Sequence, residues 1–216
     1  MNVFHVPARV HGRVVVRDAA YDGKRSRLLL AFHGYRQRAE SMIEALEPVP
    51  GAGGWTIAAI QALHPFYGRG GGVVASWMTK EDRELAIAEN VDYVDDATVA
   101  LQRERRADVI VCVGFSQGAA MAWRAAVLGR RRADGIVSIG ADIPPELRDV
   151  PAESFPIALV AGGTRDAWYT DEKMRADLQL RDEKGVPHGR LRYDGGHEWT
   201  DEVRRELGKF LAALEG

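Results

Sequence analysis

A serine flanked by glycines is the residue whose setting points most directly to chemistry. The pentapeptide G-F-S-Q-G occupies 114–118, directly after the apolar run 109–113 and before a segment with helical patterning. In this setting of strand, turn and helix, the G-x-S-x-G pattern holds the serine in a strained turn with its hydroxyl exposed. Glycines two residues before and after the serine leave room for the surrounding backbone. We therefore expect Ser116 to be a nucleophile; the alternative is a glycine-rich turn with an incidental serine.

A serine hydroxyl becomes a useful nucleophile only with a base beside it, an acid to orient that base, and donors for the oxyanion. His197 lies in the sequence G-G-H-E after the last predicted strand, 190–193. The rival histidine, His188, precedes that strand and would lie at the opposite edge of the sheet. We therefore expect His197 to be the general base.

The acid that orients the histidine should lie between the serine and the histidine in the sequence. Asp166 is the first carboxylate after the predicted strand 157–160, and Asp142, which follows the preceding strand, is the rival. The order Ser116, Asp166, His197 is the order of hydrolases that use a G-x-S-x-G serine. We expect Asp166 to hold the imidazole, with Asp142 kept as the alternative.

Two backbone N–H groups are needed to bind the oxyanion. One is expected from Gln117, which follows the nucleophile at the start of a helix, where the helix dipole also favours negative charge. The other is expected from Tyr35, because His33-Gly34-Tyr35 follows an earlier apolar run and the glycine lets the backbone approach a substrate. We expect His33 to brace this loop instead of acting as a second base.

The walls of a substrate pocket should come from loops. Residues 140–155 are all that separate two predicted strands at the place where larger hydrolases insert a cap domain, so we expect none. Aromatic side chains near the strand ends could grip an acyl or aryl group, although packing in the core is the alternative for each. The candidates are Trp77, Trp168 and Tyr169. We expect an open, uncharged site that needs no metal or other cofactor.

Apolar and helical patterns alternate through most of the chain. The central apolar runs lack polar alternation, as in parallel strands buried on both faces. Strands are expected at 13–17, 27–32, 55–60, 109–113, 135–139, 157–160 and 190–193, and helices at 38–47, 80–105, 117–128, 171–184 and 200–214. The pattern predicts an α/β fold with a mostly parallel central sheet and helices on both faces, in a single domain spanning 1–216. Ligands bind such sheets beyond the carboxyl ends of the strands, where the candidate residues fall.

Three other clusters favour structural roles. The glycines within 68–72 predict a flexible loop, because the Lys-Ser/Thr of a phosphate loop is missing. Asp92, Asp95 and Asp96 lie on a predicted helix, and we expect them to face water and not a metal ion. The basic run 130–132 follows a glycine typical of a helix end, where cations are favoured.

Composition excludes several function classes. The 216 residues include 29 basic and 31 acidic ones, a net charge of -2, which argues against nucleic-acid binding. Cys112 is the one cysteine, so there is no intrachain disulfide and no multi-thiolate metal site. No apolar run approaches the ~20 residues of a membrane span, and 1–17 lacks the apolar stretch of a signal peptide. We expect a cytoplasmic protein without stable membrane insertion; the sequence leaves open whether it forms a homodimer.

The chain resembles the phospholipase/carboxylesterase family of α/β-hydrolases, which includes acyl-protein thioesterases and small bacterial carboxylesterases. The resemblance covers nearly the whole chain and rests on His33-Gly34, on G-F-S-Q-G-A at 114–119, on Asp166 after G-G-T, and on G-G-H-E around His197. It implies the α/β-hydrolase fold and, by position, oxyanion donors at Tyr35 and Gln117. Departures flank the site: Y-R-Q follows His-Gly where the family often has L-G-D, and A-W-Y follows the acid where it often has a Val-Pro pair. They bear on the substrate and not on the hydrolytic chemistry.

The leading hypothesis is therefore a serine carboxylesterase that hydrolyses short- to medium-chain acyl esters, small molecules, through an acyl-enzyme. The second is an acyl-thioesterase or lysophospholipase with the same three residues. The third is a non-catalytic binding module on a hydrolase fold, which predicts that a member of the set is missing, whereas none is.

Overall fold

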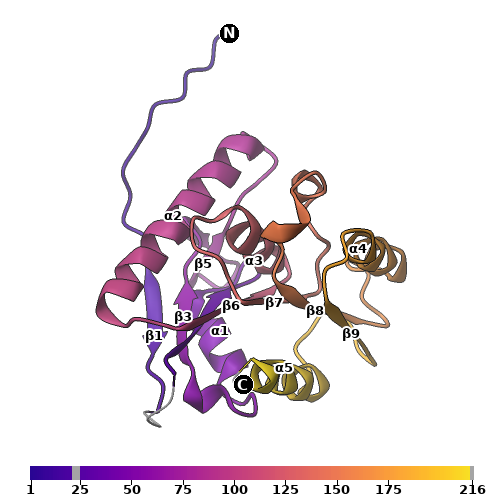
Figure 1. Ribbon diagram of the computed structural model, residues 1–216. Coiled ribbons are helices and arrows are strands. Elements are labelled where there is room, and N and C mark those ends of the chain that lie inside the picture. Colours follow the sequence, from indigo (N-terminus) through magenta and orange to yellow (C-terminus); the bar gives the residue numbers. More distant parts are fainter. Residues whose placement is uncertain (21–24, 215–216) are drawn as a thin grey trace.

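The computed structural model describes residues 1–20 and 25–214, and its centre is a seven-stranded sheet (Figure 1). The strand order is β1-β3-β2-β6-β7-β8-β9. Neighbouring strands are parallel except at one edge, where β1 runs antiparallel to β3. The strands are β1 (Val14–Arg17), β2 (Arg27–Phe32), β3 (Thr56–Ile60), β6 (Val109–Phe115), β7 (Gly135–Ile139), β8 (Ile157–Gly163) and β9 (His188–Tyr193). Each strand expected from the sequence is present; β2 and β7 have the predicted bounds, and the ends of the others are shifted.

Helices cover both faces of this sheet (Figure 1). On one face lie α1 (Ala39–Leu46) and α5 (Asp201–Ala213). On the other lie α2 (Arg83–Glu104), α3 (Gln117–Leu128) and α4 (Asp171–Glu183). Because α3 directly follows β6 and packs on β6 and β7, the turn that carries Ser116 is held at the centre of the sheet.

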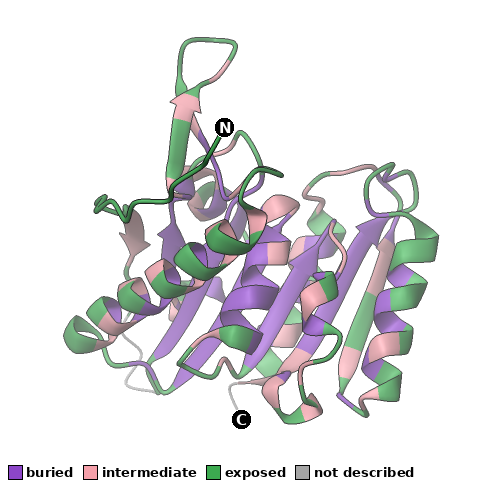
Figure 2. Ribbon diagram, turned by 90° about the horizontal axis from the view of Figure 1, so that it is seen from above, coloured by how far each residue is buried: buried purple, intermediate pink, exposed green. Residues whose placement is uncertain are grey.

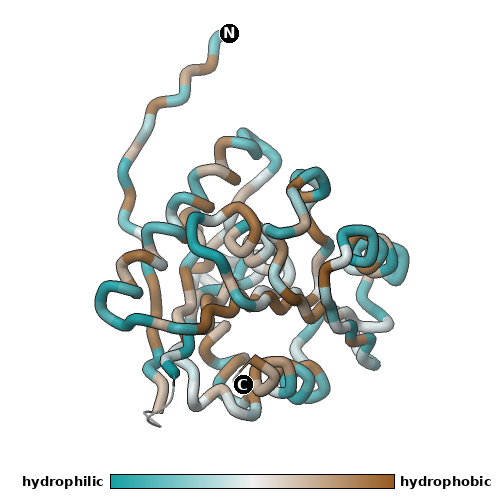
Figure 3. Tube along the Cα trace, in the orientation of Figure 1, coloured by the Kyte–Doolittle hydropathy of each residue, from teal (hydrophilic) through white to brown (hydrophobic). Residues whose placement is uncertain are grey.

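The side chains of each central strand alternate between two cores. In β2, Leu28 and Leu30 join the core beneath α2, α3 and α4, whereas Leu29 and Ala31 join the core beneath α1 and α5. Fully burying a leucine side chain contributes about 1.5–3 kcal/mol, so both faces stabilise the strand. Figure 2 shows the central strands buried and many residues of the outer helices exposed. In Figure 3 hydrophobic residues predominate along the central strands, whereas hydrophilic and hydrophobic residues alternate along the outer helices. Burial on both faces explains the continuous apolar runs of the sequence.

Threonine caps fix the start of the last two helices. The hydroxyl of Thr200 accepts a hydrogen bond from the backbone N–H of Val203 at 3.2 Å and so caps α5. Thr170 caps α4 in the same way through Lys173 N–H at 3.4 Å. Each cap contributes about 1 kcal/mol. Together they fix where the loops after β8 and β9 end, and these loops carry Asp166 and His197.

A small hairpin outside the main sheet was not predicted. β4 (His64–Tyr67) pairs with β5 (Val73–Ser76), and the glycines at 68–72 form the turn between them. A bridge between Gln37 and Ala75 joins the hairpin to the loop after β2. The sequence signal was weak because both strands are short and β4 contains Pro65, which strands disfavour.

The acidic cluster on α2 is the expected solvated surface at Asp92 and Asp96, which are exposed, but not at Asp95. Asp95 is buried and accepts hydrogen bonds from the backbone N–H and the Nε of Arg130, all at 3.0 Å. Asp96 is exposed and accepts from Nη2 of the same arginine at 2.8 Å. Arg130, the first residue of the basic run after α3, therefore holds α2 against the end of α3. Partners 34 and 35 residues apart could not be paired from sequence spacing.

The connection between β7 and β8 contains two short 3₁₀ turns, Pro145–Leu147 and Ala152–Ser154, and the described residues include no cap domain there. With one antiparallel edge strand and helices on both faces of a parallel sheet, the architecture is the α/β-hydrolase fold that the sequence predicted. Within residues 1–20 and 25–214, no helix combines the length and the apolar character that crossing a bilayer requires.

Candidate active site

Ser116 adopts a backbone conformation that few residues other than glycine adopt, with φ 56° and ψ -126°. Its two flanking glycines are required by close packing. A Cβ added to Gly114 would lie 2.3 Å from the carbonyl oxygen of Gly118, and one added to Gly118 would lie 2.1 Å from that of Phe32. The N–H of Ser116 donates to the carbonyl of Ile139 at 2.8 Å, which ties the turn to β7. The strand-to-helix turn is thus as sharp as the motif predicts.

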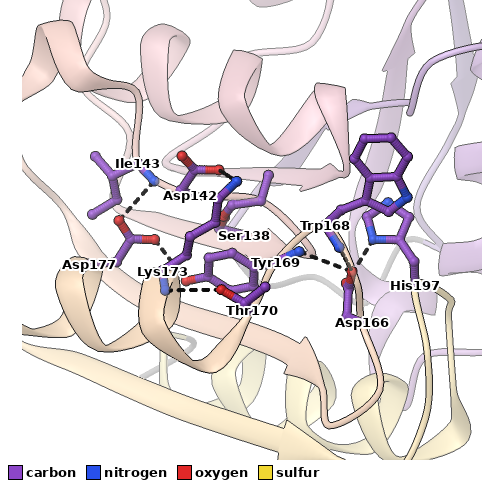
Figure 4. Close-up of polar contacts among 11 residues, drawn as sticks. Ser138, Asp142, Ile143, Asp166, Trp168, Tyr169, Thr170, Lys173, Asp177 and His197 are labelled. Atoms are coloured by element: carbon purple, nitrogen blue, oxygen red, sulfur yellow. Dashed lines mark hydrogen bonds and ion pairs between the residues drawn. The ribbon is translucent and has the colours of Figure 1, made fainter.

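His197 and Asp166 are joined by a hydrogen bond of 2.7 Å between Nδ1 and Oδ2 (Figure 4). Asp166 follows β8 and His197 follows β9, and since these strands are parallel neighbours, both loops reach the same edge of the sheet. In the neutral ring, a proton on Nδ1 leaves Nε2 free to accept one. The side chain of Asp166 is 0% exposed and that of His197 is 22% exposed, so the pair is shielded while the imidazole stays accessible.

The other oxygen of Asp166, Oδ1, accepts the backbone N–H groups of Trp168 at 2.8 Å and of Tyr169 at 3.0 Å. Burial by itself would raise the pKa of Asp166. The hydrogen bonds from Tyr169, His197 and Trp168 outweigh that effect and lower the pKa below its usual value. The carboxylate is therefore ionised at neutral pH and can stabilise a protonated imidazole.

Among the described residues Ser116 makes no hydrogen bond to this pair, but the residue before it contacts the imidazole. The ring of Phe115 lies 4.9 Å from that of His197, centroid to centroid. Gly140, with φ 72°, lies close to the imidazole, since a Cβ there would be 2.9 Å from Cε1 of His197. In sites without substrate, catalytic hydrogen bonds are often long and shorten when the substrate binds.

Neither the rival acid nor the rival base is bonded to the His197–Asp166 pair. Asp142 pairs with Lys173, with 3.3 Å between Oδ1 and Nζ (Figure 4). His188 is the first residue of β9, at the end of that strand opposite to His197, and lies 3.7 Å from a carboxylate oxygen of Asp182.

The loop after β2 lies against the serine. A Cβ on Gly34 would be 3.3 Å from Cβ of Ser116, and the N–H of Gly34 is held by Oε1 of Gln37 at 2.8 Å. Within the described chain the N–H groups of Tyr35 and Gln117 have no hydrogen-bond partner. For Gln117 this follows from its place as the first residue of α3, where no helical acceptor exists. Both N–H groups are free to bind an oxyanion.

His33 is fully buried and occupies both ring nitrogens with backbone groups. Its Nε2 accepts from Ala62 N–H at 3.0 Å, so Nδ1 carries the proton shared with the carbonyl of Gly34 at 2.8 Å. Burial lowers its pKa, against the opposing effect of that bond to Gly34. His33 therefore braces the loop, as expected.

The side chain of Gln117 was not singled out from the sequence. Its Oε1 accepts from Trp77 N–H at 2.9 Å and from the hydroxyl of Ser76 at 3.3 Å, and its Nε2 donates to the carbonyl of Met78 at 2.8 Å. These bonds tie the segment after β5 to the residue that follows the nucleophile. In the sequence, the position of Gln117 directly after the serine indicated only that its backbone N–H could bind an oxyanion, and nothing indicated a role for its side chain.

The expected aromatic walls need correction. Trp77 is fully buried, packs on Phe32 and donates Nε1–H to the carbonyl of His33 at 2.8 Å. Tyr169 is also fully buried, so both side chains belong to the core. Trp168 is 74% exposed and contributes to the pocket beside Ser116.

A pocket of about 260 Å³ opens beside Ser116. Four charged side chains line it, namely Arg83, Arg124, Asp142 and Lys173. The expected uncharged site is therefore wrong, because the fold brings together charges from three helices and a loop. A larger cavity of about 340 Å³, which includes residues 10–13, contains none of Ser116, Asp166 and His197. The described residues hold no cluster of three or more His, Cys, Asp or Glu side chains suited to a metal ion.

Comparison with known proteins places the chain in a family. The model of the Phospholipase/Carboxylesterase family matches residues 20–160, which include the serine turn. The chain therefore belongs to this family of α/β-hydrolases and is a serine hydrolase of the carboxylesterase type. Asp166 and His197 lie outside the matched range.

Solved structures with the same fold include esterases. An esterase named PE8 is 19% identical, with TM-score 0.73 and coverage of 96% of this chain and 100% of that chain. The Bacillus cereus carboxylesterase is 15% identical, with TM-score 0.74 and 94% coverage of each chain. Zea mays acyl-protein thioesterase 2 is 18% identical, with TM-score 0.74 and coverage of 95% of this chain and 100% of that chain. At these identities the likeness concerns the fold. No curated protein sequence matches the chain.

Proposed function

We propose that this enzyme is a carboxylesterase that hydrolyses short- to medium-chain acyl esters through an acyl-enzyme on Ser116, with His197 as general base and Asp166 as the residue that orients it. The observation that carries the proposal is the 2.7 Å hydrogen bond between His197 and Asp166, formed beside a serine at φ 56°. Members of the family are serine hydrolases, and this arrangement supplies a base and an acid for the serine.

In the proposed reaction, Oγ of Ser116 attacks the ester carbonyl while Nε2 of His197 takes its proton. The N–H groups of Tyr35 and Gln117 stabilise the resulting oxyanion, an interaction typically worth about 2.7–4 kcal/mol for each donor. The imidazolium, held by Asp166, then donates its proton to the departing alcohol, which leaves the acyl group on Ser116. Water, deprotonated by His197, attacks the acyl-enzyme; the imidazolium then returns this proton to Oγ of Ser116 as the bond between Oγ and the acyl carbon breaks and the acid is released.

The size of the pocket bears on the substrate. Its volume of about 260 Å³ is at the small end of ligand pockets, which favours short acyl groups over long ones. A thioesterase or lysophospholipase reaction through the same residues is the second candidate, and one structural neighbour is an acyl-protein thioesterase. Its test is a panel of butyryl esters, butyryl thioesters and lysolipids, ranked by kcat/KM.

The environment of Cys112 bears on the compartment. The thiol is fully buried, and burial raises its pKa to about 12, so it is unreactive in the folded state. An unpaired thiol is compatible with a reducing compartment. We place the enzyme in the cytoplasm, acting on small-molecule esters.

The proposal is tested with Ser116→Ala, Asp182→Asn as a surface control, and p-nitrophenyl butyrate as substrate. We expect the serine variant to lose nearly all activity and the control to keep it. A fluorophosphonate probe should label the wild type and not Ser116→Ala. Hydrolysis at the wild-type rate by Ser116→Ala would refute the proposal, and absence of labelling in the wild type would favour a non-catalytic binding module.

A further inference from the structure

The pocket beside Ser116 has more cationic than anionic side chains in its lining. Arg83 comes from the start of α2, Arg124 from α3 and Lys173 from α4. Among its described lining residues Asp142 is the one carboxylate, and it is already paired with Lys173 at 3.3 Å. The charged part of this wall offers no favourable contact to an acyl chain of methylene groups, unlike the alanine, proline and tryptophan side chains of the same pocket.

Arg124 is the most unusual of the three cations, because its side chain is only 4% exposed. Its Nε donates to Oε1 of Glu146 at 2.7 Å. Its two Nη atoms have no hydrogen bond to any described residue, yet neither is sealed from solvent. Burial lowers the pKa of Arg124, opposed by Glu146, but an arginine remains protonated at neutral pH. The pocket therefore contains a cation held in place by Glu146, and its two Nη groups can donate further hydrogen bonds.

Arg83 shares its carboxylate partner, Glu146, with Arg124. Its Nη2 donates to the second oxygen of Glu146 at 3.2 Å, so two guanidinium groups share one carboxylate. The α3 helix begins at Gln117, in the same lining, and its dipole adds partial positive charge. The wall next to Ser116 thus carries net positive charge.

We propose that this pocket binds an anionic group of the ester substrate, a carboxylate held by the guanidinium groups of Arg83 and Arg124. The inference rests on the proposed esterase function and names its substrate class: short esters that carry a carboxylate on the acyl or the alcohol side. Arginine suits this task because its planar fork of donors matches a carboxylate. The alternative is that the two arginines serve only to hold Glu146 and its 3₁₀ turn, in which case an anionic ester has no advantage.

Three esters of equal skeleton test the inference. Ethyl butyrate is neutral; monoethyl succinate replaces the terminal methyl of its acyl chain by a carboxylate; carboxymethyl butyrate replaces the terminal methyl of its alcohol. Hydrolysis is followed by titration of the acid released. We expect kcat/KM for one of the two anionic esters to exceed that for ethyl butyrate by roughly tenfold or more, the range of a charged hydrogen bond. Equal or lower values for both anionic esters would overturn the inference.

Variants separate recognition from structure. Arg83 and Lys173 are 41% and 48% exposed, so Arg83→Gln and Lys173→Gln should fold. Each should lower the ratio of anionic to neutral kcat/KM, Arg83→Gln by about tenfold. Arg175→Gln, on the exposed face of α4 and outside the pocket, is the matched control and should leave the ratio unchanged. A ratio that stays constant in Arg83→Gln and Lys173→Gln contradicts the inference.

Binding to Ser116→Ala, measured by calorimetry, keeps the inference separate from the proposed function. This variant should bind the preferred anionic ester at least about tenfold more tightly than ethyl butyrate, and adding Arg83→Gln should remove the difference. Such binding without any hydrolysis by the wild type would support the anion pocket and refute the esterase. Hydrolysis of ethyl butyrate through Ser116, with no preference for an anionic ester in binding or rate, would support the proposed esterase and overturn the anion pocket.

Discussion

Two buried carboxylates lie on either side of Tyr169, and the same residue donates a hydrogen bond to each (Figure 4). Asp166 accepts the backbone N–H of Tyr169 and the imidazole of His197. Asp177, on α4, accepts the phenolic hydroxyl of Tyr169 at 2.8 Å and the backbone N–H of Ile143 at 3.1 Å. The loop after β8 and the helix that follows thus each hold one acid.

The two acids respond differently to burial. Around Asp166, burial is outweighed by three hydrogen bonds, one of them from a group that can become a cation, and the pKa is lowered. Around Asp177, burial dominates over the bonds from Tyr169 and Ile143, nearby Asp142 adds to it, and the pKa rises to about 6. The comparison teaches that partner chemistry, and not burial itself, keeps one carboxylate ionised, as the proposed role of Asp166 requires, and leaves the other to hold the loops in place.

Of the substitutions that test this comparison, Asp166→Asn should have the largest effect, a loss of kcat. The amide cannot stabilise an imidazolium and favours the wrong tautomer of His197, so we expect kcat to fall on the order of 10⁴-fold. The measurement is kcat on p-nitrophenyl butyrate, with unfolding by urea to establish that the variant is folded. A loss below tenfold in a folded variant would show that Asp166 does not orient the base.

Asp177→Asn should change stability and not catalysis. An acid whose pKa is raised to about 6 keeps its proton in the folded state after it has lost it in the unfolded state, where the pKa is about 3.9. The free energy of unfolding contributed by Asp177 therefore falls as pH rises from about 4 to about 6, by roughly 2–3 kcal/mol. We expect the difference in unfolding free energy between wild type and variant to fall across this window and to stay constant above about pH 7.

Asp166 provides the control with the opposite sign. Its pKa is lowered, so its contribution is present above the unfolded value and is lost as pH falls below about 4. Urea unfolding of the wild type, Asp177→Asn and Asp166→Asn between pH 3 and 8 separates the two. A wild-type minus Asp177→Asn difference that rises between pH 4 and 6 would reverse the assignment of Asp177.

Tyr169→Phe removes the hydrogen bond from the hydroxyl to Asp177 and keeps the one from the backbone N–H to Asp166. The backbone N–H still holds Asp166, whereas Asp177 loses its hydroxyl partner in a buried site. Leaving a buried acceptor short of a partner costs about 1–3 kcal/mol. We therefore expect that loss in urea unfolding at pH 7, with kcat within about threefold of wild type because Asp166 is untouched. A large loss of kcat with unchanged stability would place Tyr169 in the substrate site after all.

The sequence was sufficient to predict the fold and the position of Asp166 in it. It was not sufficient to predict that Asp177 is a buried acid. Periodicity and strand–turn–helix signals located the strands, the serine turn, Asp166 and His197, because each of these depends on local pattern or chain order. Asp177 lies inside a helix of ordinary composition, and its burial depends on packing against residue 143, 34 positions away. The same reason hid the Asp95–Arg130 pair and the arginines of the pocket. Trp77 and Tyr169, but not Trp168, were misassigned, because a side chain that packs in a core and one that lines a site have the same sequence signal.

Trp168→Ala should have the smallest effect. The Trp168 backbone N–H, which binds Asp166 at 2.8 Å, is kept, and the side chain that is removed is 74% exposed. We expect kcat to stay within about twofold and KM for a butyryl ester to rise by a few-fold, since a partly solvated aromatic contact contributes about 0.5–1.5 kcal/mol. Tyr67→Ala, an exposed aromatic on β4 away from Ser116, is the matched control and should change neither parameter. A fall in kcat of tenfold or more would mean that the indole, and not only the backbone, positions Asp166, and the contrast between the two acids would then depend on side-chain packing as well as on hydrogen bonds.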